Sequence, residues 1–110
     1  MITLPHRISV IVPYQDNEGN PFDKTLFDDL LESFSKEFGG ATQTEATGAW
    51  INENGKLIIE PVAVIYSHVS EYDFTDNGAV EFIRTLADDL RVELKQESIA
   101  YQIDNTLYLN

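Results

Sequence analysis

The chain has no cysteine among its 110 residues. Disulfides, thiol nucleophiles, zinc–thiolate sites and iron–sulfur clusters are therefore excluded. Basic residues are also few: seven Lys and Arg stand against 19 Asp and Glu, for a formal net charge of −12. Because Lys and Arg supply most of the affinity for nucleic acids and anionic membranes, we expect the protein to bind neither. The excess charge mainly indicates solubility. The alternative is an acidic nucleic-acid mimic that inhibits a partner with a basic site.

Long hydrophobic runs are absent as well. The longest mostly apolar segment, residues 57–66, contains Glu60 and Pro61 and is far shorter than the about 20 residues that span a bilayer. The N-terminus has no basic segment followed by an apolar run, so we expect no signal peptide and a cytoplasmic protein. Hydrophobic residues still make up 43% of the chain, enough for the core of one domain over residues 1–110.

The hydrophobic pattern predicts five strands and two helices. We expect strands at residues 7–14, 42–51, 57–69, 98–103 and 106–109. The first helix begins at Asn20 or Asp23 and ends at the glycines of residues 39–40, and the second begins at Thr75 or Asp76. The order βαββαβ with a C-terminal β-hairpin is typical of the ferredoxin-like fold. This is an α+β class, in which an antiparallel sheet carries two helices on one face.

The dipeptide Asn54-Gly55 predicts how the second and third strands pair. Such a pair favours a two-residue type I′ turn, in which both central residues have positive φ. That register sets Trp50 beside Ile59 and Ala49 beside Glu60.

The third predicted strand is apolar on both of its alternating sides, apart from Glu60. A sheet with one face in water normally alternates apolar and polar residues. Since soluble monomers rarely expose large apolar patches, we expect something to cover the open sheet face. A face-to-face homodimer is the simplest cover.

Glu60 is the strongest candidate for chemistry. It interrupts an apolar strand, and Pro61 follows it. Proline cannot donate to the ladder, so we expect a bulge or an unpaired position there. If Glu60 points into the covered face, burial raises its pKa, which suits a general acid or base. The alternative is a solvated carboxylate, or one paired with a Lys or Arg.

Five further residues are candidates with a structural alternative for each. Trp50 is the only tryptophan and forms either core packing or the wall of a ligand pocket. Tyr14 ends the first strand with its hydroxyl free to bond a ligand, and His68 lies late in the third strand. Each is either a site residue or a structural group satisfied within the fold. Gln96 and Glu97 join the second helix to the fourth strand. They either supply an amide and a carboxylate to a ligand or are solvated loop residues.

Four short motifs carry a resemblance to a family of small uncharacterised bacterial proteins. They are Gly48-x-Trp50, Asn54-Gly55-Lys56, Glu60-Pro61 and Gln96-Glu97-Ser98. The resemblance covers about two-thirds of the chain. It implies a ferredoxin-like fold and brings no established activity. The family's shared residues map onto Trp50, Glu60, Gln96 and Glu97.

The sequence as a whole predicts a small cytosolic homodimeric protein that acts as a ligand-binding or interaction module. The alternatives are a small enzyme with Glu60 as general acid or base, assisted by His68 or Tyr14, and the acidic mimic. We expect no metal and no cofactor. Two stretches resemble calcium loops, but one has Pro21 where glycine is needed and the other has Arg84 where a bidentate Glu is needed.

Overall fold

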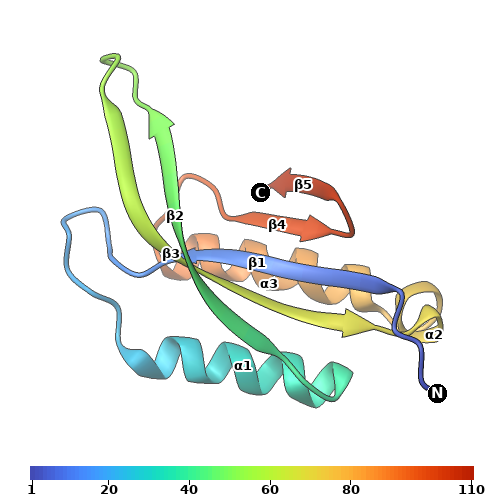
Figure 1. Ribbon diagram of the computed structural model, residues 1–110. Coiled ribbons are helices and arrows are strands. Elements are labelled where there is room, and N and C mark those ends of the chain that lie inside the picture. Colours follow the sequence, from blue (N-terminus) through green and yellow to red (C-terminus); the bar gives the residue numbers. More distant parts are fainter.

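The computed structural model describes residues 1–110 and shows a five-stranded antiparallel sheet with three helices (Figure 1). The strands are β1 (His6–Pro13), β2 (Thr42–Ile51), β3 (Leu57–Val69), β4 (Ala100–Ile103) and β5 (Thr106–Leu109). The helices are α1 (Lys24–Phe38), α2 (Glu71–Thr75) and α3 (Ala79–Glu93). The strand order is β2-β3-β1-β4-β5, and every neighbouring pair is antiparallel. No helix is long and apolar enough to cross a membrane.

Local capping fixes both ends of α1. The side chain of Asp23 accepts a hydrogen bond from the Thr25 N–H at 3.0 Å and so satisfies a free donor of the first turn. Gly39 ends the helix with φ at 87°, a left-handed conformation that glycine adopts without a steric penalty, and its N–H bonds to the Ser35 carbonyl. Of the two predicted starts, Asp23 is therefore the N-cap.

The second predicted helix begins later than expected. Ser70 caps the short helix α2, and Asp76 ends it. Gly78, with φ at 77°, then leads into α3. The prediction that Thr75 or Asp76 caps the long helix is wrong, because the Ser70 hydroxyl starts a separate helical turn by accepting from the Asp73 N–H at 3.1 Å.

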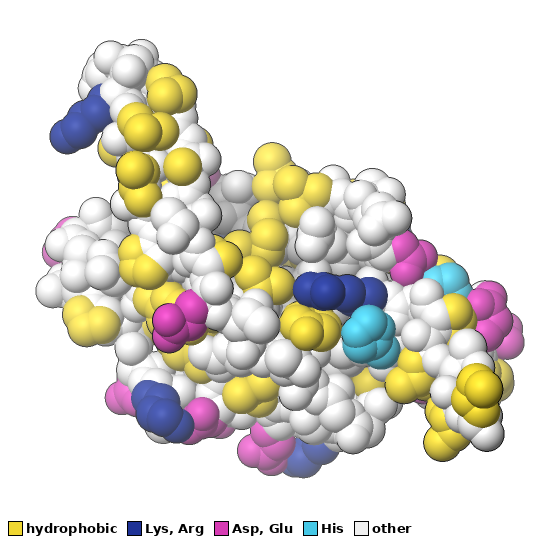
Figure 2. All heavy atoms as spheres, viewed as in Figure 1, with side chains coloured by type: hydrophobic (Ala, Val, Ile, Leu, Met, Phe, Trp, Pro, Cys, Tyr) yellow, Lys and Arg dark blue, Asp and Glu magenta, His cyan; other side chains and the backbone are white.

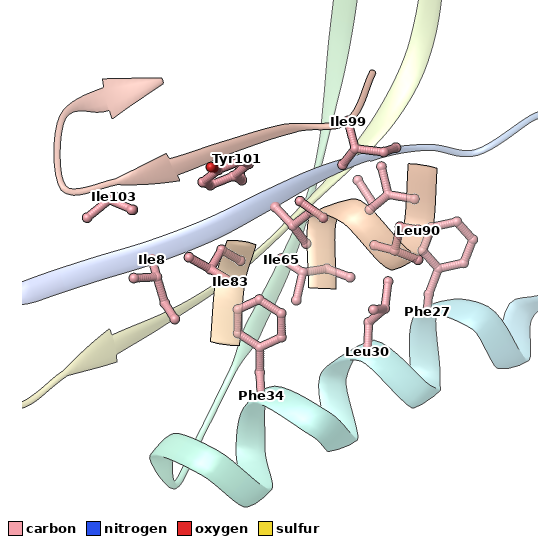
Figure 3. Close-up of a cluster of buried hydrophobic side chains, with 14 of the residues drawn as sticks. Ile8, Phe27, Leu30, Phe34, Ile65, Ile83, Leu90, Ile99, Tyr101 and Ile103 are labelled. Carbon is pink, nitrogen blue, oxygen red and sulfur yellow. The ribbon is translucent and has the colours of Figure 1, made fainter. Parts of the chain in front are cut away.

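The core lies between one face of the sheet and the helices α1 and α3 (Figure 3). Alternate residues of β1 and β3 point toward the helices, among them Ile8, Val10 and Ile65, which have no exposed surface. Phe34 of α1 and Ile83 of α3 are equally buried and fill the space opposite. The other sheet face has no helix over it, so the remaining residues of each strand form an open face.

The turn between β2 and β3 differs from the predicted one and shifts the strand register by one residue. Asn52 closes the turn, because its side chain accepts hydrogen bonds from the N–H groups of Asn54 and Lys56 at 2.9 Å each. Only Gly55 has positive φ, as in a three-residue loop with a glycine bulge. Trp50 consequently pairs with Ile58, and the predicted pairing with Ile59 is wrong.

Strands β2 and β3 extend past the rest of the sheet as a two-stranded arm (residues 47–61; Figure 1). β1 ends where Pro13 pairs with Val62, and the Pro61 carbonyl accepts the Tyr14 N–H at 3.2 Å. Pairing of Pro61 with Thr47 is uninterrupted, whereas the β1 pairing ends at Val62. Of the two predicted alternatives, the bulge is therefore wrong and the unpaired position is observed on the β1 side. Pro61 lacks an N–H on the side of β3 that faces β1. Because the pairing with β1 has already ended at Val62, no hydrogen bond of the sheet is lost there. The arm lengthens the molecule to 49 Å.

Candidate functional site

The side chain of Glu60 is a half-buried carboxylate on the open face of the arm. None of the five salt bridges of the chain involves it. Burial raises the pKa of Glu60, and no neighbouring charge or donor offsets this effect. The partial desolvation of this carboxylate is therefore uncompensated within the chain.

Gly48 lies directly beside Glu60 on the neighbouring strand. A Cβ added at Gly48 would lie 4.0 Å from the Cγ of Glu60 and 3.4 Å from a methyl carbon of Val62. A Cβ at position 48 would therefore be in ordinary van der Waals contact with Val62 and Glu60.

Trp50 lies on the same face as Glu60, two residues farther along the arm. This follows from the register, because Trp50 pairs with Ile58, and Ile58 and Glu60 point to the same side of β3. Trp50 is 47% exposed, so it is not the core residue that the packing alternative predicted. Figure 2 shows that the arm presents hydrophobic side chains at its surface. The shifted turn thus places a carboxylate and an indole on one apolar face.

Tyr14 lies on the other side of the sheet from Glu60. Its ring packs against Phe27 of α1 with the centroids 4.9 Å apart, and its hydroxyl accepts a hydrogen bond from Gln43 at 3.0 Å. Tyr14 also lines a hollow of about 300 Å³ with Glu45 and Thr47 at the base of the arm. Tyr14 is therefore not placed to assist Glu60.

Gln96 and Glu97 take part in other contacts. The Gln96 amide donates to the Leu94 carbonyl at 3.2 Å and to the Asn17 side chain at 3.4 Å. Glu97 lines a wholly polar hollow with Arg84 and Asp88 beside α3. The motif that contains both residues thus holds two loops together.

His68 is exposed at the far end of β3 and belongs to a group that sequence reasoning missed. The ring of Tyr66 stands edge-on to the His68 ring at 5.8 Å. The guanidinium of Arg7 lies 3.7 Å from the centre of the Tyr66 ring. Arg7 pairs with His68 across β1 and β3. The alternation of β1 marks Arg7 as facing away from the core, but only the strand pairing brings these three side chains together.

A second missed group surrounds His6. Its two ring nitrogens contact Glu71 at 2.6 Å and Asp104 at 3.0 Å, and its ring stacks on Phe74 at 3.7 Å. Hydrogen bonds to Asp104 and Glu71 raise the pKa of His6. The bond between His6 and Asp104 also lowers the pKa of Asp104. The group links β1, α2 and the β4–β5 turn. No three His, Asp or Glu side chains are arranged to hold a metal ion.

The fold can be compared with known proteins. No protein-family model matches the sequence, and no curated protein matches it. Two solved structures of a small α+β enzyme are similar to the chain over its whole length. They are a phage SAM lyase in complex with S-methyl-5'-thioadenosine (TM-score 0.66, 17% identity) and a phage SAM lyase in the apo state (TM-score 0.70, 18% identity). Each match covers 100% of this chain and 94% of the other. At this identity the likeness establishes the fold alone.

Proposed function

We propose that the protein binds S-adenosylmethionine on the open face of the arm and cleaves it to methylthioadenosine. The observation that carries the proposal is the unpaired, half-buried carboxylate of Glu60 beside Trp50, in a fold similar to that of the phage SAM lyases. S-adenosylmethionine has two cationic groups and an adenine ring. A desolvated carboxylate and an exposed indole complement these groups, because aromatic faces attract both cations and flat rings.

The finer fold assignment belongs to the same proposal. We classify the domain as a ferredoxin-like split βαβ fold. Without β5, the strand order is β2-β3-β1-β4, and the two crossover connections contain α1 and α3. The antiparallel pair β4–β5 then forms the C-terminal hairpin of this fold.

The proposed reaction breaks the bond between the sulfonium sulfur and the γ-carbon of the aminobutyrate group. The sulfur keeps the electron pair and leaves as neutral methylthioadenosine. The substrate's own carboxylate closes on the γ-carbon, so that a lactone forms and no water is consumed. The positive sulfonium and the negative carboxylate both lose their charge in this step. Water stabilises the charged substrate, so the barrier is lower in apolar surroundings than in water. The exposed Trp50 and the adjacent Ile58 and Val62 supply such surroundings.

We assign Glu60 to the substrate's ammonium group. A carboxylate held against the sulfonium would stabilise the charge that the reaction removes and so slow the step. The ammonium keeps its charge throughout, so binding it orients the substrate without opposing the chemistry. Glu60 is a binding residue in this proposal, and neither Tyr14 nor His68 assists it.

The test is to incubate the purified protein with S-adenosylmethionine and measure methylthioadenosine by chromatography against a protein-free control. We expect Glu60→Gln to lower kcat/KM by roughly 30-fold or more, since losing one partner of a desolvated charge pair costs about 2–5 kcal/mol. The matched control is Glu53→Gln, because Glu53 is an exposed carboxylate of the same arm.

A thermal-shift titration with S-adenosylmethionine separates binding from cleavage. A melting-point increase without methylthioadenosine release would support a ligand-binding module in place of an enzyme. The absence of both a melting-point shift and methylthioadenosine would overturn the proposed function. Equal losses in Glu60→Gln and Glu53→Gln would overturn the role of Glu60.

A second proposal is that two copies associate through the arm and the open sheet face. It is supported by the large apolar side chains exposed on that face, which are Trp50 on the arm and Leu107 and Leu109 on β5. The opposite side of the arm also exposes Ile51, Leu57 and Ile59. Burying Trp50 against a second copy would also complete the desolvation of Glu60, because both face the same side of the arm. Light scattering at micromolar concentration is expected to give the mass of a dimer and, for Trp50→Ala, a weaker association. A monomeric mass for the unmodified chain would contradict the proposal.

A further inference from the structure

The far end of the open sheet face carries a cationic group that the proposed reaction does not use. His68 is eight residues from Glu60 on β3, so at about 3.3 Å per residue the two are roughly 26 Å apart. Arg7 is half-buried and His68 is exposed. In Figure 2 a basic side chain and a histidine lie side by side on this face. The Arg7 guanidinium forms no salt bridge, although the Asp104 carboxylate accepts the Arg7 backbone N–H at 3.1 Å.

Arg7 is held in place but keeps its hydrogen-bonding capacity. Three of the other basic side chains, Lys24, Lys36 and Arg91, form salt bridges with acidic residues of their own helices. Arg7 forms none, and the Tyr66 ring supports its guanidinium at 3.7 Å. Stacking fixes the plane of a guanidinium and leaves its N–H groups free at the edge. That is the arrangement that binds carboxylates and phosphates through two parallel hydrogen bonds.

A hollow of about 420 Å³, within the size range of small-ligand sites, shares Tyr66 and His68 with this group, although Arg7 itself does not line it. Tyr66 and His68 line it on β3, Thr42 lines it at the start of β2, and Leu4 and Phe38 add apolar walls. The hollow is therefore suited to the uncharged part of a ligand whose charge meets Arg7.

We propose that Arg7, Tyr66 and His68 form a binding site for a small organic anion. A carboxylate or phosphate meets the guanidinium, and an apolar or aromatic portion enters the adjoining hollow. The site lies apart from Glu60, so it does not depend on the proposed cleavage of S-adenosylmethionine.

The test is an NMR titration of the 15N-labelled protein with three probes at constant ionic strength: phenyl phosphate, benzoate and neutral benzyl alcohol. We expect the two anions to shift the amide signals of Thr42, Tyr66 and His68, and benzyl alcohol to leave them in place. Tighter binding of phenyl phosphate would identify the ligand as a phosphate, and tighter binding of benzoate as a carboxylate. Equal shifts with benzyl alcohol, or none with the anions, would overturn the proposal.

Substitutions connect the binding to Arg7. Arg7→Gln is expected to weaken the affinity by about tenfold or more, because each charge-assisted hydrogen bond contributes about 1.5–3 kcal/mol. Arg84→Gln is the matched control, since Arg84 lines a separate hollow, and it should leave the affinity unchanged. If Arg7→Gln does not fold, His68→Gln replaces it, because His68 is exposed. Unchanged affinity in the folded variant would contradict the site.

Discussion

The two halves of β3 differ although both are apolar in sequence. From Val62 to Val69 the strand lies between β1 and β2, and its inward residues Ala63 and Ile65 have no exposed surface. From Leu57 to Pro61 only β2 lies beside it, and Leu57 and Ile59 are 52% and 63% exposed. Neighbouring elements, rather than the composition of the strand, determine what is buried.

The two halves of β3 also differ in how strongly packing constrains their residues. The inward residues Ala63, Ile65 and Val69 of the covered half belong to the core, so that half is constrained by packing. The arm half makes few contacts with the rest of the domain, and Glu60 lies on it without a partner. Exposed apolar side chains and an uncompensated carboxylate are features of a surface that binds something.

The largest expected difference between the halves concerns stability. Ile65→Ala removes a side chain with no exposed surface and is expected to lower the free energy of unfolding by about 2–5 kcal/mol, because it leaves a cavity. Ile59→Ala, the matched change on the arm, is expected to alter it by only about 0.5 kcal/mol. Urea denaturation of both variants measures the two values.

If Ile65→Ala and Ile59→Ala lower the free energy of unfolding equally, the two halves of β3 do not differ in burial within a single chain. A loss in Ile59→Ala that grows with protein concentration would instead indicate association between copies. In that case a second copy covers the arm, as proposed above, and its apolar residues are buried in the assembly.

The next largest effect is expected from a substitution in the turn between β2 and β3. Asn52→Ala removes the acceptor for the N–H groups of Asn54 and Lys56. We expect the free energy of local opening to fall by about 1 kcal/mol, so that the Lys56 amide exchanges roughly fivefold faster. Asn54→Ala keeps the backbone N–H and is the control. The same acceleration in both variants would show that the Asn52 side chain does not set the turn.

This turn illustrates how far the sequence predicts the fold. The bounds of β2, β3 and β5 are as predicted, because alternating apolar runs identify strands well. The predicted register is wrong by one residue, because the Asn52 side chain accepts a hydrogen bond from the Lys56 N–H and so favours a three-residue loop over the two-residue loop expected for Asn54-Gly55. A one-residue shift reverses which side chains share a face. Trp50 and Glu60 are neighbours on one face only in the observed register.

The candidate residues show the same limit. Glu60 stood out because a charged residue interrupts an apolar strand, which is a local signal. Gln96 stood out as part of a motif, but its amide contacts Asn17, and that loop pairing has no local signal. Arg7 and His68 are 61 positions apart in sequence and adjacent only through the pairing of β1 with β3. Sites assembled across strands need the topology before they can be recognised.

The pH dependence of stability is expected to distinguish the arm from the rest of the sheet in the acid range. Burial raises the pKa of Glu60 above its ordinary 4.5, so the folded state binds more protons than the unfolded state just above that pH. The free energy of unfolding therefore falls as pH rises through this window. Glu60→Gln should remove this slope and be slightly more stable than the unmodified chain at neutral pH. Thermal melts between pH 4 and pH 7 measure both; a less stable variant at neutral pH would contradict the desolvation of Glu60.

The smallest effect is expected at the opposite end of the sheet, where His6 has two carboxylate partners. Hydrogen bonds to Asp104 and Glu71 raise the pKa of His6 above its ordinary 6.5. The stability contributed by these contacts is fully present below about pH 6.5 and is lost as pH rises through the folded pKa. Melting points should fall slightly from pH 6 to pH 8, and His6→Gln should flatten the change. The Glu60→Gln variant should keep this slope, because Glu60 on β3 and His6 on β1 titrate in different pH windows. A His6→Gln variant with the same slope as the unmodified chain would show that these contacts do not form in solution.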